Sequence, residues 1–132
     1  MERFAVACAS GSLRTSLQDA AGLTHFDHRW TDGGVDVAAS FTGAHLLHAA
    51  VAACLLNDVH REAGNLGVPV DGVRVEAEGG FDPDWSSTGI SYRIRVDSPA
   101  DPDALAQLLA VVDQVAEVPR ALRAGAAVTP AG

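Results

Sequence analysis

The sequence predicts an α+β fold in which antiparallel strands surround one long, mostly buried helix. The segment from Gly43 to Asn65 is rich in Ala and Leu and contains no Pro, which is typical of a helix. Residues 73–78 and 90–96 alternate apolar and polar side chains, as antiparallel strands with one buried face do. The chain has 132 residues, of which 48% are hydrophobic. This length and composition suit one packed core, so we expect residues 1–132 to form a single domain.

The predicted helix has clear ends and a large apolar surface. Thr42 is a suitable N-cap, and Gly67 followed by Pro69 ends the helix. The first half of the helix is apolar nearly all round, so it must be buried on most sides. A domain of this size can hardly bury such a helix alone. The sequence therefore favours a dimer, or a sheet wrapped around the helix.

Short strands are expected before this helix. Residues 3–9, 12–18 and 23–30 predict three strands, although the alternation of apolar and polar side chains is loose in the second and partial in the third. The residues Thr-Asp-Gly-Gly at 31–34 predict a turn. Residues 35–39 predict a short strand or an extended lead-in to the helix.

The two strands after the helix carry a charged face. Arg93 and Arg95 on the second strand are positioned to pair with Glu76 and Glu78 on the first. A carboxylate-binding site is one interpretation of this group. A solvated outer face is the simpler one, with each pair contributing about 0.2–1 kcal/mol.

A second helix is predicted near the C-terminus. Asp101 is a suitable N-cap, and Pro102 suits the first helical position. Apolar residues then recur at helical spacing, at Leu105, Leu108, Leu109, Val112 and Val115. Pro119 is expected to break or kink the helix. Residues 126–129 suggest a last strand.

Charge and composition exclude several functions. The formal net charge is −8, and all nine basic residues are Arg. An acidic surface repels phosphate groups, so we expect no nucleic-acid partner. Without Lys there is no Schiff-base chemistry, pyridoxal phosphate anchor or Walker lysine. No apolar stretch reaches the roughly 18 residues that a membrane span needs. We therefore expect a cytoplasmic protein without a membrane partner.

Two cysteines, Cys8 and Cys54, are too few for a disulfide scaffold. Cys54 lies in the middle of the long helix. It is either an inert buried thiol or a nucleophile whose pKa a nearby cation lowers. Arg61 lies two turns along the same helix, too far to activate Cys54 directly, so a cation from another element is required.

The sequence offers weak support for a metal or a cofactor. His45 and His48 are three residues apart on the helix and are positioned to share an ion. His25 and His28 would point to opposite faces of a strand. The chain contains no HExxH, CxxC, GxSxG or GxGxxG motif. We expect no metal and no cofactor.

A specific resemblance involves the long helix and the segments C-terminal to it. The residues Leu-Leu-His-Ala-Ala-Val-Ala-Ala-Cys at 46–54, then Gly-Val-Pro-Val at 67–70 and the strand at 73–79, resemble the osmotically induced protein C and organic hydroperoxide resistance (OsmC/Ohr) family. The strand at 90–96 and the next helix, with Pro119 near its end, are similar too. The resemblance covers about residues 43–129.

This resemblance implies an OsmC-like α+β fold and an intertwined homodimer, with sheets from both chains around two central helices. Active family members reduce organic hydroperoxides with a thiolate on the central helix. The resulting sulfenic acid is then resolved as a disulfide by a second cysteine. Cys54 matches the first, peroxidatic cysteine. By approximate spacing, Arg14 is the candidate for the N-terminal arginine that stabilises the thiolate.

Two departures from the family pattern leave two hypotheses open. Val118 stands where the second cysteine is expected, and Ala44 stands where the family has a glutamate. The chain is therefore either a thiol peroxidase for small hydrophobic hydroperoxides or an inactive homodimer that binds a small apolar ligand. The peroxidase needs either an external thiol reductant or Cys8 as the resolving thiol.

Overall fold

The computed structural model describes residues 2–132 and has one antiparallel sheet packed against helices. The sheet has five strands: β1 (Phe4–Gly11), β2 (Leu23–His28), β3 (Thr31–Ala38), β4 (Gly72–Phe81) and β5 (Ser87–Asp97). The helices are a 3-10 helix, η1 (Ser12–Leu17), and three α-helices, α1 (Gly43–Leu66), α2 (Pro102–Val115) and α3 (Glu117–Ala124). The α+β prediction is confirmed.

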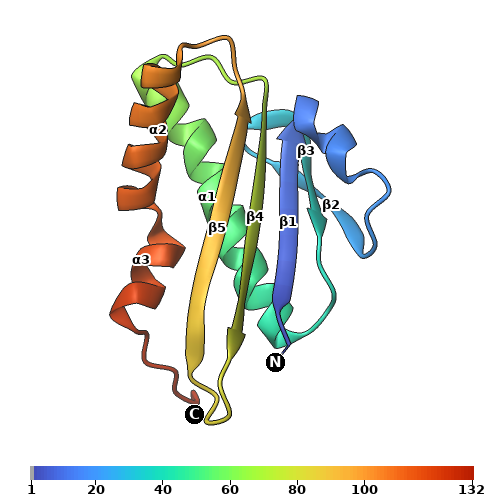
Figure 1. Ribbon diagram of the computed structural model, residues 1–132, viewed down its shortest axis with the longest axis vertical. Helices are drawn as coiled ribbons and strands as arrows, with labels where there is room; N and C mark the ends of the chain where they lie inside the picture. The colour runs from blue at the N-terminus through green and yellow to red at the C-terminus, as the bar shows by residue number, and fades with distance from the viewer. Residues whose placement is uncertain (1) are drawn as a thin grey trace.

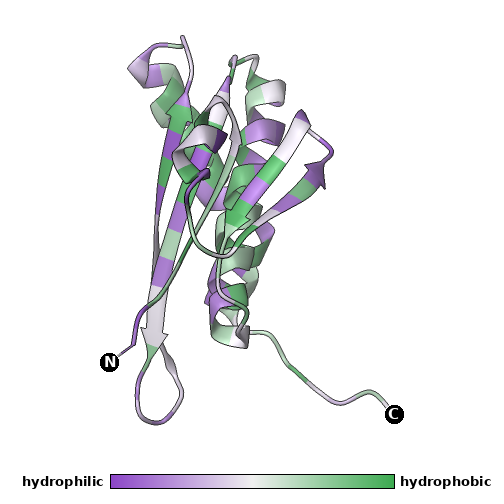
Figure 2. Cartoon of the chain, turned by 90° about the vertical axis from the view of Figure 1, so that its right-hand side faces the viewer, coloured by the Kyte–Doolittle hydropathy of each residue, from purple (hydrophilic) through white to green (hydrophobic). Residues whose placement is uncertain are grey.

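The strand order in the sheet is β2-β3-β1-β4-β5, with every neighbouring pair antiparallel. Helix α1 crosses one face of this sheet, and α2 and α3 lie beside it (Figure 1). Strands β4 and β5 alternate between hydrophilic and hydrophobic residues along their length (Figure 2). Their apolar side chains face the core because successive residues of a strand point to opposite faces.

The core forms where α1 packs against the sheet and α2. Its large, fully buried apolar side chains come from these three layers and are Leu55, Leu56, Val59, Val73, Val75, Leu108 and Val112. Burying one such side chain contributes about 1.5–3 kcal/mol to stability. Helix α1 is therefore fixed in the core between His48 and Ala63, the span of its buried residues, and it positions the side chains on its other faces.

The predicted ends of α1 and the predicted start of α2 are confirmed. The Thr42 hydroxyl accepts a hydrogen bond from the His45 backbone N–H, and Gly67 ends α1 in the left-handed conformation with φ +68°. The Asp101 carboxylate accepts a bond from Ala104 N–H at the start of α2. The predicted break at Pro119 is corrected: the helix is interrupted at Ala116, whose backbone is not helical, and Pro119 lies within the first turn of α3. No helix in residues 2–132 combines the length and hydrophobicity that a membrane span requires.

The predicted strand at residues 12–18 is wrong, because this segment forms η1. Gly11 turns the chain with φ +55°, and a Cβ there would lie 2.1 Å from the Asp71 carbonyl oxygen. The Ser16 hydroxyl then donates to the Leu13 carbonyl at 2.6 Å. Such local side-chain bonds favour a helical turn over a strand ladder.

Two further predictions are corrected. Residues 31–34 are the start of β3, and the turn lies just before them at 29–30. Gly34 marks a close approach between strands, because a Cβ there would lie 2.4 Å from the Phe26 carbonyl oxygen, next to a bulge in β2. Residues 126–129 form no strand. They belong to a C-terminal segment that runs away from the body of the protein (Figure 2).

Candidate functional site

The Cys54 thiol lies where the middle of α1 meets the start of α3. Its Sγ is 3.5 Å from Glu117 Oε2, to which the S–H donates. It also accepts a hydrogen bond from the Val118 backbone N–H at 3.4 Å. Cys54 is 8% exposed. The break at Ala116, which is fully buried, allows a new helix to begin at Glu117, and this brings two consecutive residues of α3 onto the thiol.

One guanidinium organises the charges around this thiol. Arg61 binds three carboxylates, at 2.9 Å from Asp58, 3.1 Å from Glu62 and 3.0 Å from Glu117. Asp58 is buried, whereas the Glu117 side chain is 61% exposed. Since Glu117 binds Arg61 through one oxygen and Cys54 through the other, Arg61 is linked to the thiol by this carboxylate.

Burial and charge together disfavour the thiolate of Cys54. Burial raises the pKa of the thiol, the Val118 N–H partly opposes this, and the Asp58 and Glu117 carboxylates raise the pKa further. Burial also raises the pKa of Asp58 to about 6, against the opposing effect of Arg61. The pKa of Glu117 is lowered by its own backbone N–H and by Arg61. The site therefore holds a protonated thiol next to an ionised carboxylate.

Arg14 is placed elsewhere in the chain. Its Nε donates to Asp36 Oδ2 at 3.0 Å, and its Nη2 lies 3.3 Å from His25 Nδ1. Within residues 2–132, the groups bonded to Cys54 are Glu117 and Val118, and Arg14 is not among them. A role for Arg14 in stabilising the Cys54 thiolate stays a prediction.

Sequence reasoning does not identify Glu117 or the network that holds it. Asp58 and Arg61 are three residues apart on one helix, the spacing of a helical ion pair, and this signal is present in the sequence. Glu117 has no such signal, because it lies 63 residues from Cys54 and reaches it only through tertiary packing.

Cys8 is a poor match for a resolving thiol in this arrangement. It is 1% exposed in the middle of β1, and burial raises its pKa to about 12. Both cysteines are free thiols. By contrast, Val118, which stands where the resemblance places the second cysteine, lies directly beside Cys54.

The histidines considered for a metal do not converge on one point. His45 Nδ1 lies 2.6 Å from the Thr42 hydroxyl, and His48 Nδ1 donates to the Ala44 carbonyl. In the described chain, Cys54, Asp58 and Glu117 do have potential ligand atoms within 4.8 Å of one another. Both carboxylates are already bound to Arg61, and we assign them no metal.

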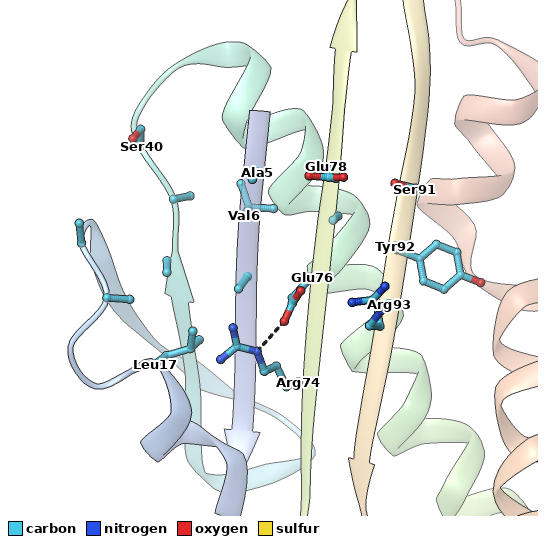
Figure 3. Close-up of a pocket in the computed structure, with 16 residues that line it drawn as sticks. Ala5, Val6, Leu17, Ser40, Arg74, Glu76, Glu78, Ser91, Tyr92 and Arg93 are labelled. Atoms are coloured by element: carbon cyan, nitrogen blue, oxygen red, sulfur yellow. Dashed lines mark hydrogen bonds and ion pairs between the residues drawn. The ribbon is translucent and has the colours of Figure 1, made fainter. Parts of the chain in front are cut away.

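Two surface grooves lie away from the thiol. One, of about 480 Å³, runs between the β2–β3 hairpin and an exposed side of α1, and its largest apolar side chains are Phe26, Trp30 and Leu46. The other, of about 630 Å³, lies on the outer face of the sheet (Figure 3). There Glu76 pairs with Arg74 rather than with Arg93, which lies opposite it in the ladder (Figure 3).

Glu78, at the same outer face, pairs with Arg3. Within residues 2–132, Arg93 and Arg95 have no ion pair, so the predicted pairing with Glu76 and Glu78 is not formed. A solvated face with local ion pairs explains these charges without a ligand.

Comparison with known proteins shows which solved structures share this fold. A search of curated proteins finds no match. Among solved structures, an OsmC-like protein from Mycoplasma pneumoniae matches with a TM-score of 0.59 and 12% identity, over 80% of this chain and 89% of that one. An OsmC-like hydroperoxide resistance protein from Jannaschia sp. CCS1 matches with a TM-score of 0.58 and 14% identity, over 97% of this chain and 91% of that one. At such identities the similarity shows the fold alone. The sequence model of the OsmC-like protein family matches residues 33–131, most of the chain, and the chain therefore belongs to this family.

Proposed function

We propose that this protein reduces organic hydroperoxides with Cys54 as its single reactive thiol and an external thiol as reductant. The hydrogen bond that the Val118 backbone N–H donates to Sγ carries the proposal, because an N–H donor stabilises the thiolate that attacks the hydroperoxide. Membership of the OsmC-like family supports it, as does the description of one structural relative as a hydroperoxide resistance protein.

The proposed chemistry needs no second cysteine in the chain. The Cys54 thiolate attacks the terminal oxygen of the hydroperoxide, so that an S–O bond forms and the O–O bond breaks. The alkoxide takes a proton and leaves as the alcohol, and Cys54 becomes a sulfenic acid. An external thiol then displaces water to form a mixed disulfide. A second external thiol attacks that disulfide and returns Cys54 to the thiol.

Treatment with graded cumene hydroperoxide should add oxygen atoms to Cys54 without forming a disulfide. A sulfenic acid with no thiol beside it proceeds to the sulfinic acid, and Cys8 is buried in the sheet. Intact mass and peptide mapping would show one and then two added oxygens on Cys54, and none in a Cys54→Ser variant. A loss of two hydrogens with a Cys8–Cys54 crosslink would contradict this expectation.

A second candidate function is binding of a small apolar ligand, favoured by the groove of about 480 Å³. Its wall includes Phe26 and Trp30 from the hairpin and Ala50 and Ala53 from α1. An apolar ligand there would change the fluorescence of Trp30, in the Cys54→Ser variant as in the natural protein. Unreactive Cys54 together with such binding would favour this function over peroxide reduction.

We also propose that two copies of the chain associate through this face of α1. Phe26, Trp30 and Leu46 are 54%, 38% and 43% exposed, so a large apolar surface is uncovered in one chain.

Sedimentation at micromolar concentration should therefore report a dimer. An Ala50→Arg substitution, in the groove, should dissociate it because the new charge would be buried at the contact. Ala106→Arg, on the exposed side of α2, is the matched control. A folded monomer of the natural protein would refute the proposed association.

A further inference from the structure

Glu117 covers the Cys54 thiol in a way that a reactive cysteine does not require. Its Oε2 is 3.5 Å from Sγ, and its Oε1 is 3.0 Å from Arg61 Nη1. Arg61 is thereby turned toward the carboxylate rather than toward the sulfur. The groups facing the thiol are thus a carboxylate from α3, the buried Asp58 carboxylate from α1, and one backbone N–H.

A carboxylate in this position opposes formation of the thiolate. An anion next to a thiol stabilises the protonated form, because ionisation would place two negative charges side by side. The positive charge of Arg61 is shared among Asp58, Glu62 and Glu117. Little of that charge is therefore available to the sulfur. Burial is the main cause of the raised pKa of Cys54, and the Asp58 and Glu117 carboxylates add to it in the same direction.

Glu117 and Asp58 differ in how readily each can be removed from the thiol. Asp58 is 1% exposed and fixed on the core helix, one turn from Cys54. The Glu117 side chain is 61% exposed and lies in the first turn of a helix of 8 residues. Of the two carboxylates, only Glu117 can leave the sulfur without exposing the core.

We propose that Glu117 restrains Cys54 in its unreactive thiol form, and that removing the Glu117 charge activates the sulfur as a nucleophile. This inference deepens the proposed function and rests on it for its biological meaning. Glu117 acts on the sulfur of Cys54, and Arg61 is the residue that positions the Glu117 carboxylate. A substrate or partner that draws Glu117 away would release the thiol.

The rate of alkylation of Cys54 by iodoacetamide tests the restraint without peroxide. Glu117→Gln keeps the shape of the side chain and removes its charge. The midpoint of its pH–rate profile should fall by about one pH unit, and its rate at pH 7 should rise about threefold, because the larger thiolate fraction outweighs the lower nucleophilicity of a less basic sulfur. Glu62→Gln is the matched control, since Glu62 also binds Arg61 but makes no hydrogen bond to Cys54.

The possible outcomes show whether Glu117 restrains the thiol or instead assists its reaction. A lower rate in Glu117→Gln would mean that Glu117 acts as a base for Cys54, which overturns the proposal. An unchanged profile, or an equal change in Glu62→Gln, would overturn it too. Thermal unfolding verifies that each variant folds, and Glu117→Ala provides a second variant if the first does not. Faster alkylation with no oxidation by cumene hydroperoxide would keep the restraint and reject the peroxidase.

Discussion

A Val118→Cys substitution should form a disulfide with Cys54 and change the product of peroxide treatment from oxygen adducts to a crosslink. The backbone nitrogen of residue 118 lies 3.4 Å from Cys54 Sγ, and a thiol on residue 118 would be only three bonds from that nitrogen, within reach of the oxidised sulfur. The sulfenic acid of Cys54 would react with the new thiol and release water, which protects Cys54 from over-oxidation. Intact mass would then show the loss of two hydrogens in place of added oxygen.

The same crosslink should stabilise the fold. It would join positions 64 residues apart, and closing a loop of that length contributes about 4 kcal/mol through the entropy of the unfolded chain. Chemical denaturation with and without reductant measures the difference. Val115→Cys is the matched control, because residue 115 ends α2 and precedes the interruption at Ala116 that brings residues 117 and 118 onto the thiol. Oxygen adducts on Val118→Cys without a crosslink would show that the two sulfurs do not meet.

The sequence predicts well those helices and strands for which composition, capping residues and core packing all favour the same structure. Helix α1 is expected at Gly43–Asn65 and spans Gly43–Leu66, because composition, the Thr42 cap and Gly67 all favour it. Strands β4 and β5 are predicted from the strict alternation of apolar and polar side chains. The structure has the same alternation in burial, because one face of each strand is packed against the core. Here local preference and tertiary packing act in the same direction.

The wrong predictions for the segments before α1 have a different physical cause. Residues 12–17 alternate loosely, and hydroxyl groups at Thr15 and Ser16 bond the backbone locally instead of leaving it to a ladder. The glycines at 33 and 34 look like a turn, but Gly34 serves a strand in which the neighbouring backbone comes too close for a side chain. Periodicity does not report such contacts between distant backbone segments.

The site around Cys54 is predictable only in part, because some of its contacts are local in the sequence and others are not. The resemblance identifies Cys54, and the spacing of Asp58 and Arg61 on one helix face is visible in the sequence. Glu117 is not predictable, since its contact with Cys54 depends on the break at Ala116 and on how α3 packs against α1. The sequence predicts a cation from another element and excludes Arg61 as too distant; in the structure Arg61 is linked to the thiol through Glu117, and this carboxylate has the opposite effect on the sulfur to that of a cation.

An Arg61→Ala substitution should destabilise the protein strongly at pH 8 and weakly at pH 5. Arg61 is the ion-pair partner of the buried Asp58 carboxylate, and removing one partner of a buried pair costs roughly 3 kcal/mol because it leaves an uncompensated charge. Arg123→Ala is the matched control. It breaks an exposed pair with Asp113 and should cost less than about 1 kcal/mol at either pH.

The pH dependence is set by the direction of the pKa shift of Asp58. Its pKa is raised to about 6 in the folded protein, so the folded state binds a proton that the unfolded chain releases at lower pH. The contribution of this group to stability is therefore greatest at low pH and is lost as the pH rises through about 6. Without Arg61 the folded pKa of Asp58 rises further, because only burial and the neighbouring carboxylates then act on it.

At pH 5 Asp58 is mostly protonated with or without Arg61, and the two proteins should unfold at similar denaturant concentrations. At pH 8 the variant must either keep a buried charge or take up a proton, and its midpoint should fall well below that of the natural protein. Equal losses at both pH values would mean that Arg61 stabilises the fold through its packing and not through Asp58.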